Sequence, residues 1–413
     1  MTTLQEVVAQ LDAGKTMTMQ DWEVVTRAAV DPNTPDSDLV SVLLAIKRRE
    51  DSGSAAYSPA EIADFISAAA RSGTLLQAQS YGREDEIVSA GGHATGGVFE
   101  TKTDLVSPLL VAAGVDLALD LSGARLGHTG GTLERHTGVG LKVYPSLRNL
   151  PDLAKRSDWV LFGQTPEICP ADGRLYRLRD LNHEKHGLVM VDILITMSIL
   201  SKKFASGLGA LGVMVTFGSG GLAKGSEGAV RLGQMMADAG TALGMPTSCM
   251  SVDMSTPLGR MGGTRRAFAE ACLVLTKEST SPDLLEVAME LASLILANTA
   301  IASDLLDARS KIRRAYESGD AVRVVERFLE AHGGNPRIVS NPVPILRSSF
   351  QLKVVAPQDG YYRPTAIEIG RILNEVLIGD FEANGERPAP GFDPSAGIDL
   401  LDELFAGEVK AGT

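Results

Sequence analysis

The feature that most constrains this chain is a pair of glycine-rich turns, each placed directly after a run of apolar residues. The first is Gly91-Gly92-His93-Ala94-Thr95-Gly96-Gly97, behind an apolar run that opens at Ile87. The second runs from Ser122 to Thr132 and follows the apolar segment 115–121, with a helical run over 105–113 between them. Strands that end in glycine turns and lead into helices are typical of α/β folds, in which such turns gather at one sheet edge.

Both turns suit an anionic ligand. Glycine lets the backbone approach a ligand closely, and the start of a following helix adds partial positive charge. Several hydroxyls accompany the backbone N–H groups: Thr95, Thr103, Ser122, Thr129 and Thr132. Converging donors of this kind bind phosphate oxygens, although a single serine or threonine in a turn often only caps a helix. The turns therefore predict a phosphate-type site. The motifs typical of ATP and NAD sites are missing.

Two further groups of residues are candidates for chemistry. His93 is the only ionisable residue of the first turn, and such a histidine is either structural or catalytic. Ser198 and Lys202 lie four residues apart in an apolar helical run and so share one helix face, with Arg179 upstream. One interpretation is a solvated helix end that carries Lys202 and Lys203. The other is a dry pocket in which a hydroxyl, an ammonium and a guanidinium bind a planar base with two carbonyls.

Composition excludes several classes of protein. The 413 residues are 44% hydrophobic and 22% charged, as expected of a globular enzyme, and the net charge of −12 disfavours a nucleic-acid partner. Three cysteines without CxxC spacing and six scattered histidines indicate neither a disulfide framework nor a metal site, and His183 and His186 are expected in a surface loop over 181–187. We find no signal peptide, and the apolar run 189–200 is too short to span a bilayer. We expect a cytoplasmic protein without membrane or metal.

The periodicity predicts an α/β fold: a small all-helical domain, a larger α/β domain with a mixed central sheet, and a shortened C-terminal α+β part. Residues 3–68 have helical spacing, and the pattern changes to strand–turn–helix alternation near residue 75. The predicted segments are 1–72 (helical domain, first part), 73–163 (α/β domain, first part), 164–206 (helical domain, second part), 207–339 (α/β domain, second part) and 340–413 (C-terminal region). We expect the active cleft between the two domains.

These residues resemble the thymidine and pyrimidine-nucleoside phosphorylase family, which is related in fold to anthranilate phosphoribosyltransferase. The resemblance extends over most of residues 1–265. The matching runs are His93-Ala94-Thr95-Gly96-Gly97-Val98, Leu126-Gly127-His128-Thr129-Gly130-Gly131-Thr132-Leu133, Phe162-Gly163-Gln164-Thr165, Pro170-Ala171-Asp172, Arg174-Leu175-Tyr176, Leu178-Arg179-Asp180, Ser198-Ile199-Leu200-Ser201-Lys202-Lys203 and Pro257-Leu258-Gly259-Arg260.

The resemblance implies a pentosyltransferase that uses inorganic phosphate to cleave a pyrimidine nucleoside into a pentose 1-phosphate and the free base. In the family the base is bound by residues that match Arg179, Ser198 and Lys202, and the residue that matches His93 assists departure of the base. Hydroxyls that match Thr103, Ser122 and Thr132 bind phosphate, to which we add Thr95 and Lys102 as candidates. The resemblance also implies a homodimer and no cofactor besides the phosphate cosubstrate.

The sequence departs from the family in the first turn. Gly92 replaces the family's phosphate-binding lysine, Ala94 replaces a serine, and Gly91 replaces the acidic residue before the lysine. The family's Val-Gly-Asp is Val98-Phe99-Glu100 here, and the C-terminal part is shorter. A cation beside a bound dianion contributes ~1.5–3 kcal/mol, so these changes predict weaker phosphate binding.

Three explanations follow from this departure. Lys102 supplies the missing charge; or the pocket serves phosphate-independent transfer or hydrolysis of a modified nucleoside; or the protein binds a nucleoside without turnover. A phosphoribosyltransferase is disfavoured, because only Glu227 lies near the third glycine turn, 218–225, where acidic pairs would be needed.

Overall fold

The structure is a computed structural model, and it describes residues 2–53, 57–84, 87–123, 129–279, 281–362, 365–378, 392–401, 404 and 408–411. Part of the second glycine turn, 124–128, lies outside these ranges. So does the Pro/Gly-rich stretch from Arg387 to residue 391.

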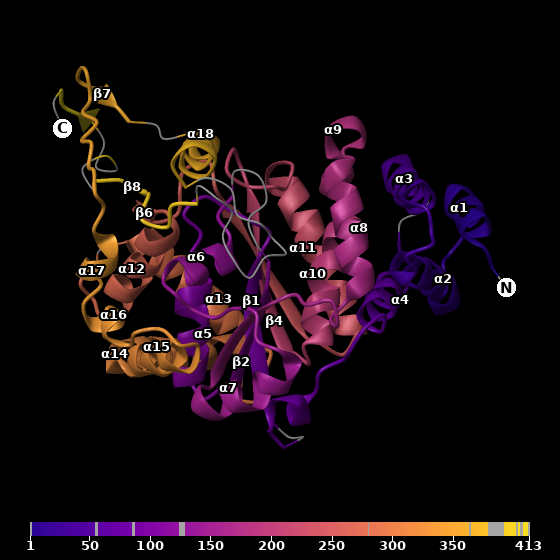
Figure 1. Cartoon of the computed structure of the whole chain (residues 1–413), viewed down its shortest axis with the longest axis horizontal. Helices are drawn as coiled ribbons and strands as arrows, with labels where there is room; N and C mark the ends of the chain where they lie inside the picture. The colour runs from indigo at the N-terminus through magenta and orange to yellow at the C-terminus, as the bar shows by residue number, and fades with distance from the viewer. Residues whose placement is uncertain are drawn as a thin grey trace.

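A five-stranded sheet forms the centre of the molecule, with strand order β3-β2-β1-β4-β5 (Figure 1). The strands are β1 (Ser89–Ala94), β2 (Leu117–Ser122), β3 (Trp159–Gly163), β4 (Ala210–Phe217) and β5 (Thr247–Asp253). All four pairings are parallel, so the prediction of a mixed central sheet is wrong in that respect. The reason is that a helix separates each strand from the next, and such crossovers return the chain to the same sheet edge.

Helices cover both faces of this sheet. On one face α5 and α13 pack against β1 and β4, and α14 and α15 lie outside them. The close packing needs a small residue at Gly212, where an added Cβ would lie 2.4 Å from Ile295. The helices that follow the strands of the sheet are α5 (Thr103–Ala112), α6 (Thr132–Gly138), α7 (Leu150–Arg156), α11 (Gly225–Ala242), α12 (Thr264–Leu275), α13 (Pro282–Ala297), α14 (Leu305–Ser318) and α15 (Asp320–Ala331). Of these, α11 lies on the opposite face, where it packs against β4, β5, α4 (Pro59–Ala70) and α10 (Asp192–Ala205).

On the other face lies a helical layer built from two separate stretches of the chain (Figure 1). Its members are α1 (Leu4–Asp12), α2 (Met19–Val30), α3 (Asp36–Ser52), α4 (Pro59–Ala70), α8 (Pro170–Leu181) and α10 (Asp192–Ala205). Thr3 and Thr18 begin α1 and α2 with capping boxes, and a buried ion pair of 2.6 Å joins Arg49 to Glu61. One hydrophobic cluster continues from these helices onto the sheet, so the domain boundaries stay a prediction.

The sequence predicts a surface loop over 181–187, but the structure has a further helical turn there, α9 (His183–His186). His186 N–H donates to the carbonyl of Asn182 at 3.0 Å, which continues the helical bonding. Short 3₁₀ turns complete this half of the chain: η1 (Ala78–Tyr81), η2 (Leu147–Asn149) and η3 (Leu188–Met190).

The C-terminal part packs over the first glycine turn. Val98 and Phe99 form a third hydrophobic cluster with Ala366, Leu373 and Ile378. Its elements are α16 (Arg337–Ser340), α17 (Val343–Leu346), α18 (Ala366–Arg371), the π-helical η4 (Ile372–Ile378) and two short antiparallel pairs, β6 (Met261–Gly262) with β8 (Ile398–Asp399) and β7 (Gly360–Tyr361) with β9 (Glu408–Val409). Residues 366–378 are thus helical, with a π-helical second half.

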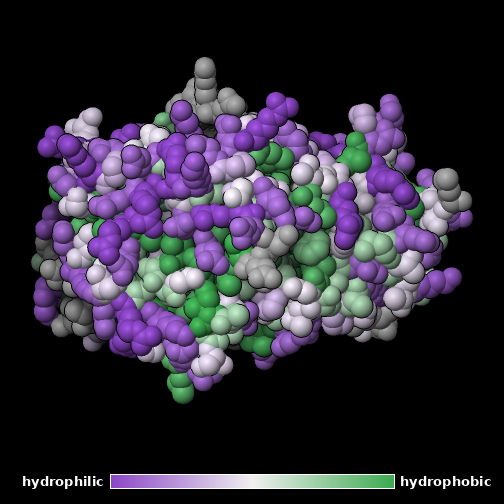
Figure 2. Space-filling view, turned by 90° about the horizontal axis from the view of Figure 1, so that it is seen from below, coloured by the Kyte–Doolittle hydropathy of each residue, from purple (hydrophilic) through white to green (hydrophobic). Residues whose placement is uncertain are grey.

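No helix among the described residues is long and apolar enough to cross a membrane. Seen from below, the surface is hydrophilic around the rim and carries hydrophobic residues toward the middle (Figure 2). The three cysteines, Cys169, Cys249 and Cys272, are free thiols.

Candidate active site

Lys202 is the centre of the candidate base-binding half. Its Nζ lies 2.9 Å from Ser198 Oγ, one turn earlier on α10, and 2.7 Å from Asp172 Oδ2 on α8. The Asp172 side chain is buried, and its second oxygen has no hydrogen-bond partner among the described residues. The ammonium is therefore oriented by one carboxylate and one hydroxyl, and it remains partly exposed. The predicted contact between Ser198 and Lys202 is present.

Arg179 and Tyr176 complete this half. The Arg179 guanidinium is buried and donates to the carbonyls of Leu194 at 2.8 Å and Val189 at 3.1 Å, which fixes the start of α10 against α8. It lies 5.6 Å from the centre of the Tyr176 ring, and Lys202 Nζ lies 5.9 Å from it. An aromatic ring beside two cations offers a planar ligand a stacking surface.

Asp172 and Tyr176 had no predicted role. Their spacing was a usable signal, because Asp172, Tyr176 and Arg179 stand at i, i+4 and i+7 and so share one face of α8. A carboxylate, an aromatic ring and a guanidinium in one stripe of a helix that also carries exposed charges indicate a binding surface rather than a solvated face.

His93 lies on β1, paired with Val213 of β4, and is half-buried. Burial, and then the positive charges of Lys203, Lys102 and Lys202, hold the pKa of its imidazole well below the usual range. The ring is therefore neutral at pH 7 and has one N–H donor. The three lysines come from α10 and the start of α5, so His93 of the first turn is within range of charges from both elements.

The first turn leads to Lys102, which is buried and precedes α5. Its Nζ lies 2.7 Å from Thr103 Oγ1 and 4.0 Å from Glu100 Oε1. Thus Lys102 already has a hydroxyl and a carboxylate beside it. Gly92 faces the same helix, because a Cβ there would lie 3.4 Å from Val106, one turn after Lys102.

Thr95 is placed differently from the other hydroxyls. Its Oγ1 lies 3.1 Å from Thr216 Oγ1 and accepts from Thr216 N–H at 3.0 Å, so the hydroxyl joins the end of β1 to β4. Ser122 ends β2 and is buried, whereas Thr132 opens α6 and is half-buried. The structure brings Lys102 to Thr103 and Ser198 to Lys202, while Thr95 is engaged with the sheet.

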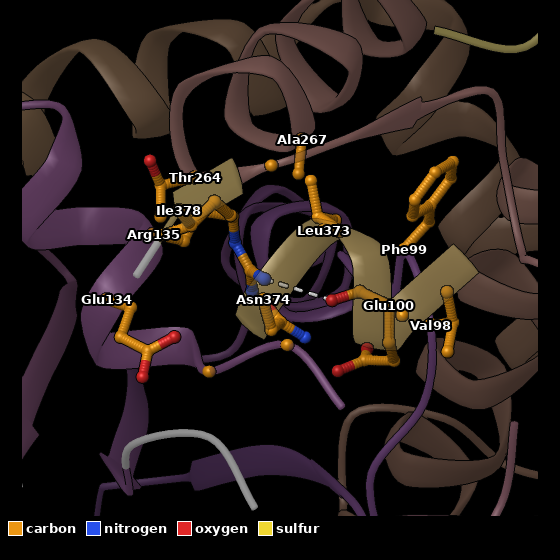
Figure 3. Close-up of a pocket in the computed structure, with 14 residues that line it drawn as sticks. Val98, Phe99, Glu100, Glu134, Arg135, Thr264, Ala267, Leu373, Asn374 and Ile378 are labelled. Atoms are coloured by element: carbon orange, nitrogen blue, oxygen red, sulfur yellow. Dashed lines mark hydrogen bonds between the residues drawn. The ribbon is translucent and has the colours of Figure 1, made fainter. Parts of the chain in front are cut away.

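A buried network holds the helices that follow the two turns. Asp104 of α5 lies 2.5 Å from Arg135 Nε and 2.8 Å from His136 Nε2 of α6. Arg135 also donates to the Glu100 carbonyl at 2.9 Å (Figure 3). His136 Nδ1 lies 2.7 Å from the Thr132 carbonyl. The network therefore fixes α6 relative to α5.

Beside this network lies a small pocket between the two turns and the C-terminal part (Figure 3). Its lining includes Phe99 and Glu100, Arg135 of α6, and Leu373 and Asn374 of η4. Its volume is about 30 Å³, the space of a single water, so it does not hold a nucleoside. In the described part of the chain, no three His, Cys, Asp or Glu side chains are grouped so that they could hold a metal ion.

Comparison with models of protein families finds none that matches this chain. The chain is 30% identical to a thymidine phosphorylase of Colwellia psychrerythraea over 401 residues, 96% of this chain and 87% of that one. It is also 30% identical to a pyrimidine-nucleoside phosphorylase of Bacillus subtilis over 409 residues, 98% of this chain and 89% of that one.

Among solved structures, anthranilate phosphoribosyltransferase from Thermus thermophilus has the same fold, with a TM-score of 0.59 and 15% identity over 79% of this chain and 98% of that one. The fold and the sequence agree with the predicted family. This chain belongs to the thymidine and pyrimidine-nucleoside phosphorylase family.

Proposed function

We propose that the protein catalyses phosphorolysis of a pyrimidine nucleoside, in which inorganic phosphate displaces the base and leaves a pentose 1-phosphate. The observation that carries this proposal is Lys202, whose ammonium is oriented by Asp172 and Ser198 beside the Tyr176 ring. The named relatives are phosphorylases, and none of them supports phosphate-independent transfer or a non-catalytic role.

The base-binding half stabilises the departing base. Breaking the glycosidic bond places negative charge on the base and positive charge on the sugar. Lys202 and the Ser198 hydroxyl are donors for base oxygens, and Arg179 fixes the helix that carries them. Donors that are in place before the reaction stabilise charge as it develops, without reorganisation.

His93 supplies a donor between the two halves. Because its imidazole is neutral at pH 7, we assign it a hydrogen bond to a base carbonyl rather than the transfer of a stored proton. A bound phosphate dianion would offset the lysine charges that lower its pKa, so phosphate binding raises the pKa of His93.

We propose inorganic phosphate as a cosubstrate and no resident cofactor. The donors proposed for it are Lys102, Thr103, Ser122 and Thr132, with Thr95 as a support of the turn. The helix α5 begins at this place and adds partial positive charge. The anionic nucleophile would stand opposite the base, where the sugar carries positive charge in the transition state.

The test measures release of free base from uridine, thymidine and deoxyuridine, with and without inorganic phosphate. The proposal expects release that depends on phosphate and yields one pentose 1-phosphate per base. Release without phosphate would identify a hydrolase, and saturable nucleoside binding without release would identify a binding protein. The Lys155→Ala variant is a matched control, because Lys155 is an exposed lysine in the last turn of α7 and belongs to neither half of the candidate site.

We also propose that two copies associate through the helices of the N-terminal part. In Figure 1, α1, α2 and α3 lie at one end of the molecule, away from the glycine turns, so a partner there leaves the site open. Sedimentation of the full chain distinguishes one copy from two. The cytoplasmic location stays a prediction from the sequence.

A further inference from the structure

Lys203 has an unusual environment that the family resemblance does not explain. It follows Lys202 on α10, yet the residue is only 1% exposed, and Nζ has no hydrogen-bond partner among the described residues. Taking an ammonium out of water without a partner is strongly unfavourable. Folded proteins rarely keep such a group unless something binds it.

The charges around Lys203 are mostly of its own sign. The pKa of its ammonium is lowered to about 8, mainly by burial; Asp120 opposes this more strongly than Lys102 or Lys202 adds to it. Asp120 Oδ2 accepts from Ser107 at 2.6 Å and from Trp159 Nε1 at 2.8 Å, but neither Asp120 Oδ1 nor Lys203 Nζ has a hydrogen-bond partner among the described residues. Of the three lysines whose charges lower the pKa of His93, Lys203 is the one whose ammonium forms no hydrogen bond in the described part of the chain.

The substitutions in the first turn fit this excess of charge. A Cβ at Gly91 would lie 2.4 Å from the Leu119 carbonyl and 3.2 Å from Leu208, whose N–H donates to the Lys203 carbonyl at 3.3 Å. Position 91, where the family has an acidic residue, is thus close to the residue that bonds the Lys203 backbone, and a side chain there would clash with the Leu119 carbonyl. Position 92 has lost its cation at the same time. Without the acid at position 91, the negative charge that acts on Lys203 is that of Asp120, which forms no hydrogen bond with Lys203 Nζ.

Lys102 is a weaker candidate for the same role. Its Nζ already contacts Thr103 Oγ1 at 2.7 Å and lies 4.0 Å from the Glu100 carboxylate. If Lys102 moved to bind phosphate, it would lose its contact with Glu100. Lys203 Nζ has no hydrogen bond among the described residues that phosphate binding would break.

We propose that Lys203 binds the phosphate cosubstrate and replaces the cation that Gly92 lacks. The inference rests on the proposed function, since it assigns a residue to the phosphate of that reaction. A dianion beside Lys203 would give its ammonium a hydrogen-bonded counter-charge, which Asp120 does not, and it would offset the lysine charges around His93. Lys203 then contributes to the phosphate half from the same helix that carries Ser198 and Lys202 of the base half.

The experiment is calorimetric titration of the full-length protein with inorganic phosphate alone. The first variant is Lys203→Met, which keeps an unbranched side chain of similar length but removes the charge. Lys102→Met tests the competing assignment, and Lys155→Met is the control. We expect Lys203→Met to weaken phosphate binding at least about tenfold, as for loss of a charge-assisted hydrogen bond. Lys155→Met should bind phosphate within about twofold of the wild type.

Unfolding temperature without phosphate separates this role from a structural one. If Lys203 is held for phosphate, Lys203→Met unfolds at the same or a higher temperature than the wild type, and phosphate no longer raises that temperature. A structural pairing with Asp120 would instead lower it and leave phosphate binding intact, which would overturn the inference. Lys203→Gln repeats the test if the methionine variant does not fold.

Kinetics distinguish failure of the inference from failure of the proposed function. Phosphorolysis in which Lys203→Met leaves the KM for phosphate unchanged would overturn the inference and keep the function. Phosphate binding that depends on Lys203, without phosphorolysis of any nucleoside, would support the inference and overturn the function. A wild type that does not bind phosphate overturns the inference.

Discussion

The two halves of the site differ in how their charges are balanced. In the base half, Lys202 has a buried carboxylate at 2.7 Å and a hydroxyl at 2.9 Å, and both come from helices that pack together. In the phosphate half, Lys203 has no partner among the described residues, and glycine stands where the family has an acid and a lysine. The cation of the proposed base half is already paired within the protein, whereas Lys203 of the proposed phosphate half interacts with the charge of Asp120 but has no hydrogen-bond partner among the described residues.

The comparison predicts that the base half is the more sensitive to a single substitution. Lys202→Ala removes a donor for the departing base and leaves the buried Asp172 carboxylate without its cation. We expect kcat/KM to fall by about 10²–10³, the loss seen when one preorganised donor is removed. Steady-state kinetics with saturating phosphate measure it, and Lys155→Ala is the control. A fall of less than about tenfold would show that the base half does not depend on Lys202.

In the phosphate half, the buried network of Asp104, Arg135 and His136 is the rigid part. Burial alone would raise the pKa of Asp104, but Arg135 and His136 outweigh it and hold the pKa below its usual range. Asp104→Asn leaves the Arg135 guanidinium buried without a carboxylate. Breaking a buried ion pair destabilises a protein by ~3–5 kcal/mol. We expect the lower end, because the amide that replaces the carboxylate would still be able to contact His136.

Urea unfolding measures the effect of Asp104→Asn. The control is Asp152→Asn, which removes an exposed ion pair with Arg156 and should change the unfolding free energy by less than ~0.5 kcal/mol. Equal effects of the two substitutions would mean that the network does not stabilise the turns.

The same contrast governs what the sequence could predict. Ser198 and Lys202 were predictable, since a spacing of four residues on a helix brings side chains together whatever surrounds the helix. The burial of Lys203 was not predictable, because the adjacent pair Lys202-Lys203 looks like a solvated helix end. Only the packing of α10 against the sheet and neighbouring helices separates the two residues.

The strands could be predicted as apolar runs, but the prediction that the sheet mixes parallel and antiparallel strands was wrong. The apolar run 115–121 predicts a strand and contains most of β2, but a buried strand carries no pattern that shows whether its neighbours run parallel or antiparallel to it. Helical connections between all five strands decide that in favour of a parallel sheet. Asp172 and Tyr176 were missed for a different reason. Their spacing on one face of α8 is visible in the sequence, but neither residue was predicted to belong to the site.

Phe99 tests whether the C-terminal part supports the phosphate half. Its φ of 62° is left-handed, a conformation that disfavours a residue other than glycine by ~1–2 kcal/mol, and the family has glycine there. The ring is buried against Leu373 and Ile378. Because loss of a buried phenylalanine costs ~3–5 kcal/mol, we expect Phe99→Gly to destabilise the protein by a net ~2 kcal/mol.

Hydrogen exchange locates this effect. Amides of α18 and η4 should exchange faster in Phe99→Gly, since the cluster that docks them is lost. Val376→Ala changes an exposed residue of η4 and should leave exchange unchanged. If Phe99→Gly is more stable than the wild type, strain outweighs packing and the C-terminal part is held by other contacts.

The smallest effect concerns Glu270, which supports the turn Pro257 to Arg260 beside the first glycine turn. Its carboxylate accepts from Arg260 N–H at 2.6 Å, Met261 N–H at 3.1 Å and Ser281 Oγ at 2.5 Å, and Leu258 N–H donates to the Val98 carbonyl at 3.2 Å. Burial nevertheless raises the pKa of Glu270 from 4.5 to about 7. Between these pH values the folded protein keeps a proton that the unfolded chain has released.

Stability from this proton is therefore fully present below pH 4.5 and is lost as the pH rises through 7. Glu270→Gln cannot titrate, so its unfolding free energy should lack that fall, and from pH 5 to pH 8 it should gain ~1–2 kcal/mol relative to the wild type. Urea unfolding at the two pH values measures the difference, with the exposed Glu278→Gln as the control. An equal pH dependence in wild type and Glu270→Gln would mean that the carboxylate is ionised in the folded protein. The turn beside the phosphate half would then hold a permanent negative charge, which would oppose the excess of positive charge that distinguishes this half from the other.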